Sequence, residues 1–536
     1  MQPKSLTRGE IIAHIQQLVP PGSPEPQSPA LLEQLSSLTE ALIRDYEASG
    51  GLQGDPFNEA WTRPLYLYEE EVRRCLRGKT VLVTGGEGFV GRCLIDKLLE
   101  LGVNRVCSID NARCNSPNPQ PIIKQDSTVI FYPADVRHLD ALEHIFKLEK
   151  PDIVFHLAAI RIPGLAEKII LETVSSNIIG TENIIQLCEA FKVQHCIFSS
   201  TGKSSRYWTG EVYAATKKVN EWLFARAAQE GNVQYGMVRF THMLNNSSMC
   251  EQIDHKIETD HPINIHAPER YVVGQNVGEA VHLLLNALVF SQPKRLRFLL
   301  VRNLGWPTES LEVALYKIQQ SGKNLPIYFQ GIPPGYEESF FLGQVDWDHQ
   351  TEINTLVNAL ETKHCFEISS SGDMIVSEVV PFAIDTLIQQ LAQLKALCLS
   401  PRVAPTKVKQ KLAELVYQVA LTTFNQASVA RSLQILKWGI NLKQYERGAF
   451  CLKPYQPFIE LIVHSLHSRI TPDTLKQCDM PMQEFNRLLK ALNDLPSLQK
   501  ELFTIQSLLK DSHAADLTYR FKNSKLVEPC ISGIKF

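Results

Sequence analysis

The sequence predicts an α/β protein: a Rossmann-type doubly wound parallel sheet with a smaller substrate-binding region and helical N- and C-terminal extensions. Short apolar runs alternate with helical stretches from residue 79 onward. A glycine-rich turn, T-G-G-E-G-F-V-G at residues 84–91, joins the first run to the first of these helices. Because buried strands that alternate with helices build parallel sheets covered on both faces, these observations favour that fold class.

The strands and helices of the sheet are predicted from the length and spacing of apolar residues. Strand-sized apolar runs occupy residues 81–83, 105–109, 129–131, 153–155, 196–198 and 236–238. Helical stretches lie between them at 90–101, 139–148 and 177–191. Beyond about residue 240 the alternation loosens, and we expect a helix near 277–289 and a strand near 298–301.

Composition shifts divide the chain into three parts. Residues 1–77 are predicted to form a helical N-terminal extension, interrupted by the proline-rich run at 20–26, because proline cannot continue a helix. Residues 78–398 are predicted to form the domain that contains the sheet, with a substrate-binding region from about residue 240. A linker at 400–406 precedes a helical C-terminal domain at 407–536.

Composition and charge exclude several classes of protein. The 536 residues carry a net charge of −3, which gives no reason to expect a nucleic-acid partner. The longest apolar stretch, 277–290, contains polar residues and is shorter than the roughly 20 residues of a membrane span. The N-terminus lacks the apolar core of a signal peptide. None of the 12 cysteines forms a C-x-x-C pair, so we expect a reduced, cytoplasmic protein.

The glycine-rich turn predicts a dinucleotide site. Gly85, Gly88 and Gly91 fall where a strand ends and a helix begins, so the backbone can approach a pyrophosphate and the helix N-terminus can bind it. Asp110 ends the next strand, where its carboxylate can accept both ribose hydroxyls. This carboxylate favours NAD, because it would repel the 2′-phosphate of NADP. Arg113 nearby leaves NADP open.

Two further strand ends are predicted to line the cofactor. Asp135 and Val136 end the third strand and are expected beside the adenine. Ala158 follows the fourth strand, where small residues let the dinucleotide pass. Asp135 also suits a cap for the helix from residue 139, and both interpretations can hold at once.

A tyrosine and a lysine one helical turn apart are the candidate residues for proton transfer. Tyr213 and Lys217 lie at positions i and i+4 of a helix predicted to start near Glu211. Lys217 is expected to hold the nicotinamide ribose and to lower the pKa of the phenol, so that tyrosinate can act as a base. Thr201 ends the preceding strand, and its hydroxyl can reach the same reacting oxygen. His242 has no partners at metal-ligand spacing, so no metal site is predicted.

These motifs resemble the extended short-chain dehydrogenase/reductase superfamily, and within it the UDP-N-acetylglucosamine 4,6-dehydratase and CapD-like polysaccharide-biosynthesis branch. The resemblance covers about residues 65–345. Besides the glycine turn, it rests on the segments at 77–79, 135–137, 156–161, 177–181, 200–203 and 213–217. It implies catalytic use of bound NAD(P), in which C4 of the sugar is oxidised, water leaves across C5–C6 and the hydride returns at C6.

The chain differs from that branch at the position of the catalytic acid of the dehydratases. The dehydratases carry S-T-D-K, and this chain has Gly202 in place of the aspartate that would protonate the leaving hydroxyl. Lys203 remains and would serve as acid or base if burial lowers its pKa, and Glu211 is a second candidate. The sugar-nucleotide signature R-P-G-E-K reads P-P-G-Y-E at 333–337, which loses an arginine suited to pyrophosphate.

The sequence therefore predicts an NAD(P)-dependent enzyme that modifies a nucleotide sugar, of dehydratase or epimerase type. Tyr213, Lys217, Thr201 and Lys203 are the candidate catalytic residues. Two alternatives stay open: an oxidoreductase on a substrate other than a UDP-sugar, which the altered 333–337 segment favours, and a non-catalytic NAD-binding scaffold. A homodimer is compatible with the helical ends, whose apolar faces more often pack within one chain.

Overall fold

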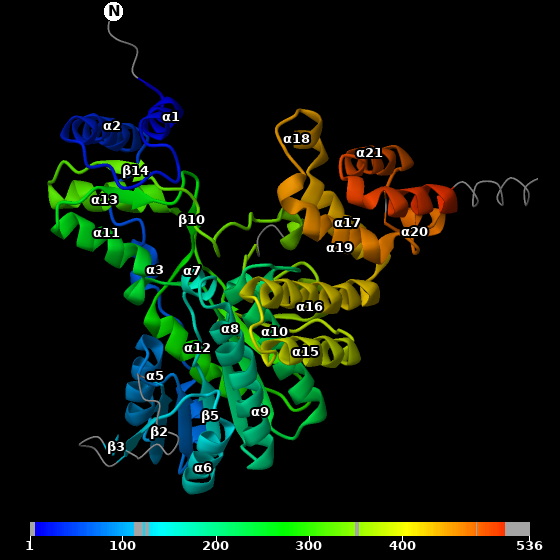
Figure 1. Ribbon diagram of the computed structural model, residues 1–536. Coiled ribbons are helices and arrows are strands. Elements are labelled where there is room, and N and C mark those ends of the chain that lie inside the picture. Colours follow the sequence, from blue (N-terminus) through cyan, green and yellow to red (C-terminus); the bar gives the residue numbers. More distant parts are fainter. Residues whose placement is uncertain (1–5, 112–121, 124–127, 349–352, 479, 510–536) are drawn as a thin grey trace, which may run out of the picture.

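A ten-stranded sheet forms the centre of the molecule (Figure 1). The computed structural model describes residues 6–111, 122–123, 128–348, 353–478 and 480–509. The strand order is β15-β16-β12-β7-β6-β5-β1-β2-β4-β3. The strands are β1 (Thr80–Thr84), β2 (Arg105–Asp110), β3 (Ile122–Ile123), β4 (Val129–Pro133), β5 (Ile153–His156), β6 (His195–Thr201), β7 (Gln234–Phe240), β12 (Arg297–Val301), β15 (Phe366–Ile368) and β16 (Met374–Glu378).

The interior of the sheet is parallel and its edges are antiparallel. Strands β4, β2, β1, β5, β6, β7 and β12 pair in parallel, and β3, β15 and β16 join in antiparallel register. Each of the strand-sized runs read from the sequence lies within one of these parallel strands. The predicted Rossmann-type parallel sheet is thus confirmed.

Helices cover both faces of the sheet because every interior strand is apolar on both sides. On one face lie α4 (Glu69–Leu76), α5 (Phe89–Glu100) and α12 (Val277–Phe290), whose buried residues share a cluster with Val81 and Val83. On the other lie α6 (Leu139–Glu149), α9 (Gly180–Ala190) and α10 (Val212–Glu230), in a cluster with Leu82 and Val154. Short α7 (Pro163–Ala166), α8 (Ile170–Val174) and a π-helix (Ser175–Ile179) precede α9.

The N-terminal helices pack against the segment that follows β7 (Figure 1). Buried leucines of α2, among them Leu35 and Leu42, join a third apolar cluster with Leu315 and Ile327. The loop before α2 is tied to the same lobe, since the Gly22 amide donates to the Gln330 carbonyl at 2.9 Å. The elements of this lobe are α1 (Arg8–Leu18), α2 (Pro29–Ala48), α3 (Asn58–Thr62), α11 (Ser248–Glu258), α13 (Ser310–Ser321), β8 (His242–Met243), β9 (Ile263–Ile265), β10 (Tyr271–Val272), β11 (Gly274–Gln275), β13 (Thr308–Glu309) and β14 (Ile327–Phe329).

The C-terminal helices extend the core on the α10 side of the sheet. Buried Leu394 of α15 and Leu412 of α16 belong to the same apolar cluster as α10. The ring of Phe458 in α19 stacks on Phe341 at 5.0 Å between centroids. These helices are α15 (Ile384–Cys398), α16 (Pro405–Gln426), α17 (Val429–Ile440), α18 (Leu442–Glu446), α19 (Gln456–Leu466), α20 (Pro472–Gln477) and α21 (Met482–Leu492). Within the described ranges, no helix has the length and apolarity to cross a membrane.

Candidate active site

A single cleft of about 1410 Å³ contains the candidate cofactor and catalytic residues. One wall is built from the carboxyl ends of β1, β2, β4, β5, β6 and β7, the edge at which parallel sheets bind ligands. The opposite wall comes from the lobe that contains α11, β9 and β14. The cleft therefore brings residues of the glycine turn and of α10, far apart in sequence, to one space.

The glycine turn is packed so tightly that larger residues do not fit. Gly85 has a φ of +73°, and a Cβ there would lie 2.8 Å from the amide nitrogen of Ala158. A Cβ on Gly91 would lie 2.2 Å from the Gly85 carbonyl oxygen. Gly88 caps α5, so the free amides and positive dipole end of that helix lie at the cleft. These features fit a dinucleotide pyrophosphate.

The predicted ribose and adenine contacts line the same part of the cleft. Asp110, Asp135, Val136 and Ala158 all face it. The Asp110 carboxylate accepts a hydrogen bond from the Glu87 amide at 3.2 Å. Burial alone would raise the pKa of Asp135, but hydrogen bonds from Arg137 lower it to about 2, so this carboxylate is charged. Arg113 lies outside the described residues, and its predicted influence on cofactor choice stays a prediction.

The candidate catalytic residues lie where β6 ends and α10 begins. Helix α10 starts at Val212 with Glu211 at its N-cap, as predicted, and carries Tyr213 and Lys217 into the cleft. Burial raises the pKa of the Tyr213 phenol, and a hydrogen bond with Thr201 and the charge of Arg161 oppose that rise. Tyr213, Lys217 and Thr201 thus come together as the motif predicts.

Lys217 is held by the end of β6. Its ammonium donates to the Ser199 carbonyl at 2.7 Å and lies 4.6 Å from the Phe198 ring centroid. Burial lowers the pKa of Lys217 to about 7. The charge of Arg161, and not that of Lys217, is among the effects that oppose the rise in the pKa of the Tyr213 phenol. Sequence reasoning gave Arg161 no role, although it directly follows the fourth strand's His-Leu-Ala-Ala-Ile segment.

Lys203 takes part in an ion cluster at the rim of the site. Its ammonium lies 2.7 Å from a Glu211 carboxylate oxygen and donates to the Gly335 carbonyl at 3.1 Å. Burial lowers the pKa of Lys203, and the charge of Glu211 opposes that shift. Arg206 bridges Glu211 and Glu338. Neither Glu338 nor Arg206 was found from the sequence, because Glu338 lies 127 positions from Glu211 and belongs to no shared motif.

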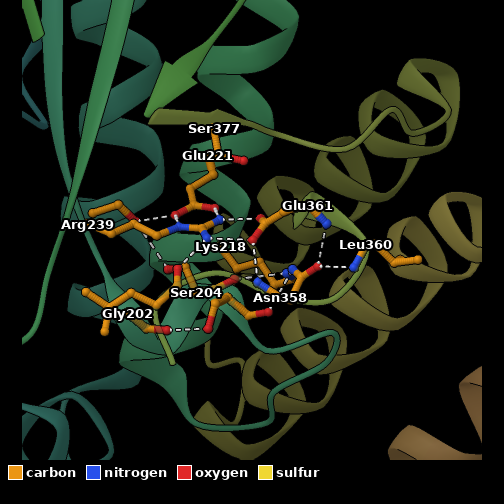
Figure 2. Close-up of polar contacts among 12 residues, drawn as sticks. Gly202, Ser204, Lys218, Glu221, Arg239, Asn358, Leu360, Glu361 and Ser377 are labelled. Atoms are coloured by element: carbon orange, nitrogen blue, oxygen red, sulfur yellow. Dashed lines mark hydrogen bonds and ion pairs between the residues drawn. The ribbon is translucent and has the colours of Figure 1, made fainter. Parts of the chain in front are cut away.

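A buried ion-pair network lies directly behind this site. Arg239 of β7 is bound on both sides, by Glu221 of α10 and by Glu361 of the short helix α14 (Glu361–His364) (Figure 2). The Ser200 hydroxyl at the end of β6 donates to Glu221 at 2.6 Å. The network therefore connects the strand that carries Thr201 with a segment more than 120 positions away in sequence.

His242, which lines the cleft, and His156, at the end of β5, both have ordinary hydrogen-bond partners. His242 Nε2 lies 2.7 Å from the Ser247 hydroxyl. His156 is fully buried between the Thr84 and Thr181 hydroxyls, at 2.7 and 3.0 Å. Among the described residues, no group of three His, Cys, Asp or Glu side chains is placed to hold a metal ion.

Comparison with known proteins places this site in a family. Residues 81–361 match the family profile described as Polysaccharide biosynthesis protein, and this range runs from β1 to the first residue of α14. The probable polysaccharide biosynthesis protein EpsC of Bacillus subtilis is 25% identical over 315 residues, covering 57% of this chain and 50% of the relative. The capsular polysaccharide biosynthesis protein CapD of Staphylococcus aureus is 25% identical over 323 residues, covering 55% of this chain and 53% of CapD.

The chain thus spans about half the length of these curated relatives. Among solved structures, Pen from Bacillus thuringiensis is 20% identical with a TM-score of 0.47. That match covers 56% of this chain and 87% of Pen.

Proposed function

The chain belongs to the polysaccharide biosynthesis family of extended short-chain dehydrogenases/reductases, and we propose that it is an NAD-dependent enzyme acting on C4 of a nucleotide sugar. One observation carries the proposal: Tyr213, Thr201 and Lys217 line the same cleft as the glycine turn and Asp110. A binding module needs the turn alone. The additional phenol and amine are the groups that a proton transfer beside a nicotinamide requires.

Each of the chain's own groups has a task in this proposal. The Tyr213 phenolate takes the proton of the sugar's O4 hydroxyl, and the Thr201 hydroxyl donates a hydrogen bond to the same oxygen. Lys217, anchored by the Ser199 carbonyl, orients the nicotinamide ribose. A bound NAD would supply an acceptor for the hydride from C4 and a donor for its return, so no outside oxidant would be consumed.

Cationic side chains in the cleft support an anionic substrate. Arg161, Lys168 and Arg270 line it. In the described part of the chain, none of these three side chains forms an ion pair with a carboxylate. A diphosphate would supply the charge that such groups bind, with arginine offering bidentate contacts. These residues are our candidates to replace the arginine missing from the 333–337 segment. We therefore favour a nucleoside-diphosphate sugar as the substrate class.

A substrate panel tests this proposal. Purified protein is loaded with NAD and incubated with nucleotide sugars, and the products are analysed by mass spectrometry and NMR. We expect one or more sugars to be converted without net consumption of NAD. Tyr213→Phe is expected to lower turnover by about 10³-fold or more and to leave NAD affinity unchanged. Undiminished turnover in that variant, or NAD binding without conversion of any sugar, would contradict the proposal.

A further inference from the structure

Position 202, where the dehydratase motif carries its acid, has no room for a side chain. Gly202 begins a short 3₁₀ turn (Gly202–Ser205) directly after β6. A Cβ built on it would lie 2.7 Å from Leu356 Cγ and 3.2 Å from Leu356 Cδ1. Real side chains do not approach so closely, since interiors are already packed to the density of organic crystals. Leu356 is buried and also lines the cleft.

We propose that Leu356 is a specificity-determining residue, which fills the place of the acid and restricts the site to redox chemistry at C4 without loss of water. This inference rests on the proposed function, because it concerns which reaction follows the C4 oxidation. An acidic side chain at position 202 would collide with the apolar side chain of Leu356, so packing excludes an aspartate there.

Backbone hydrogen bonds keep Leu356 in this place. Its amide donates to the Asn354 side chain at 3.0 Å, and its carbonyl accepts from Arg239 at 2.8 Å. The carbonyl of the preceding residue, Thr355, accepts from the Ser205 hydroxyl at 2.9 Å. Ser205 belongs to the same turn as Gly202, so the turn and Leu356 are fixed relative to each other. The backbone of Leu356 cannot shift away from the turn without breaking these contacts.

The buried ion pairs of Arg239 also hold the segment that contains Leu356. Arg239 holds Glu361, five positions after Leu356, and the Glu361 carboxylate accepts from the Asn358 amide at 2.8 Å (Figure 2). The Asn358 side chain in turn donates to the Ser205 carbonyl at 3.0 Å. Thr355 and Asn358, which lie on either side of Leu356, are thus both connected to Ser205 of the 202–205 turn.

After oxidation at C4, loss of water would need a proton donor close to the C6 hydroxyl. Loss of water requires that C5 gives up a proton and that the C6 hydroxyl leaves with an added proton. Gly202 has no proton to give, and the Lys203 ammonium beside it is held by the Glu211 carboxylate and the Gly335 carbonyl. The nearby carboxylates of Glu211 and Glu338 are both ion-paired with Arg206; burial raises the pKa of Glu338, and the charge of Arg206 opposes that rise. Oxidation at C4 and return of the hydride on the other face leave every C–O bond intact. The product then has the substrate's mass and the opposite configuration at C4.

A stability cycle tests the packing without any substrate. We expect Gly202→Ala to lower the unfolding temperature, and Gly202→Ala with Leu356→Ala to unfold no lower than Leu356→Ala alone, since the collision is then absent. Gly202→Ala with Leu360→Ala is the matched control, and there the two losses should add. Gly54→Ala, which would meet no atom within 4 Å, controls for the glycine change itself. If Leu356→Ala does not fold, Leu356→Val takes its place.

Product mass tests the chemistry. Wild-type protein loaded with NAD should convert its nucleotide sugar to a product of unchanged mass. The variant Gly202→Asp with Leu356→Ala should form some product lighter by one water, whereas Gly202→Asp alone should be poorly folded. A wild-type product lighter by one water would overturn the inference and leave the proposed function standing. Conversion of no sugar at all would contradict the proposed function, while additive losses in the Leu356 cycle would overturn the inference by themselves.

Discussion

Replacing Arg239 by methionine should destabilise the protein more than any surface ion-pair change. Arg239 donates five hydrogen bonds, two to Glu221, two to Glu361 and one to the Leu356 carbonyl. The exposed fractions of the three charged side chains are only 1%, 3% and 4%. Breaking such a pair leaves buried carboxylates without a counter-charge, which costs about 3–5 kcal/mol in the free energy of unfolding.

Urea titrations followed by circular dichroism measure this loss for Arg239→Met. The matched control is Arg226→Met, which removes an exposed ion pair with Glu230 and should cost less than about 1 kcal/mol. Adding Glu221→Gln and Glu361→Gln to Arg239→Met should recover more than half of the loss, because the unpaired charges are then removed. A loss for Arg239→Met no larger than the Arg226 control would refute this reasoning.

Three further predictions concern pH, the cofactor and the rim of the site. Burial and the charge of Lys217 lower the pKa of His156 to about 3, below its unfolded value of 6.5. Stability should therefore decline as the pH falls from 6.5 toward 3, and His156→Asn should reduce that slope in acid titrations. Asp110→Ser should weaken NAD binding about 10-fold and improve NADP binding, as measured by calorimetry. Lys203→Met should lower kcat about 10–100-fold with an unchanged Kd for NAD, measured in parallel assays.

Local patterns were sufficient to predict the sheet and the cofactor turn. The runs that became β1, β2 and β5 are apolar on both faces, and the glycines of the turn fall at fixed spacing after β1. Each of these signals lies within about 30 residues, so the sequence carries it without knowledge of tertiary contacts. The helix that begins after Glu211 was predicted in the same way, from a local change of pattern.

The contacts that shape the reaction could not be predicted in this way. Leu356 lies beside Gly202, and Glu338 beside Glu211, only because the segments after α13 return to the end of β6. Glu25 of the N-terminal extension also reaches the cleft, through an ion pair with Lys256 of α11 at 2.9 Å. The spacing of apolar residues does not predict such pairings, since they depend on how the sheet edge and the lobe that contains α11 enclose one cleft.

The surroundings of Tyr213 determine which cation favours ionisation of its phenol. Burial raises the pKa of the phenol and lowers that of Lys217 to about 7, so burial favours the neutral form of each group. A tyrosinate beside a neutral amine has no charge from Lys217 to stabilise it. The charge of Arg161 opposes the rise in the pKa of the phenol. The first ionisation of the phenol is therefore favoured by Arg161 and the Thr201 hydroxyl, and Lys217 contributes only where it is protonated.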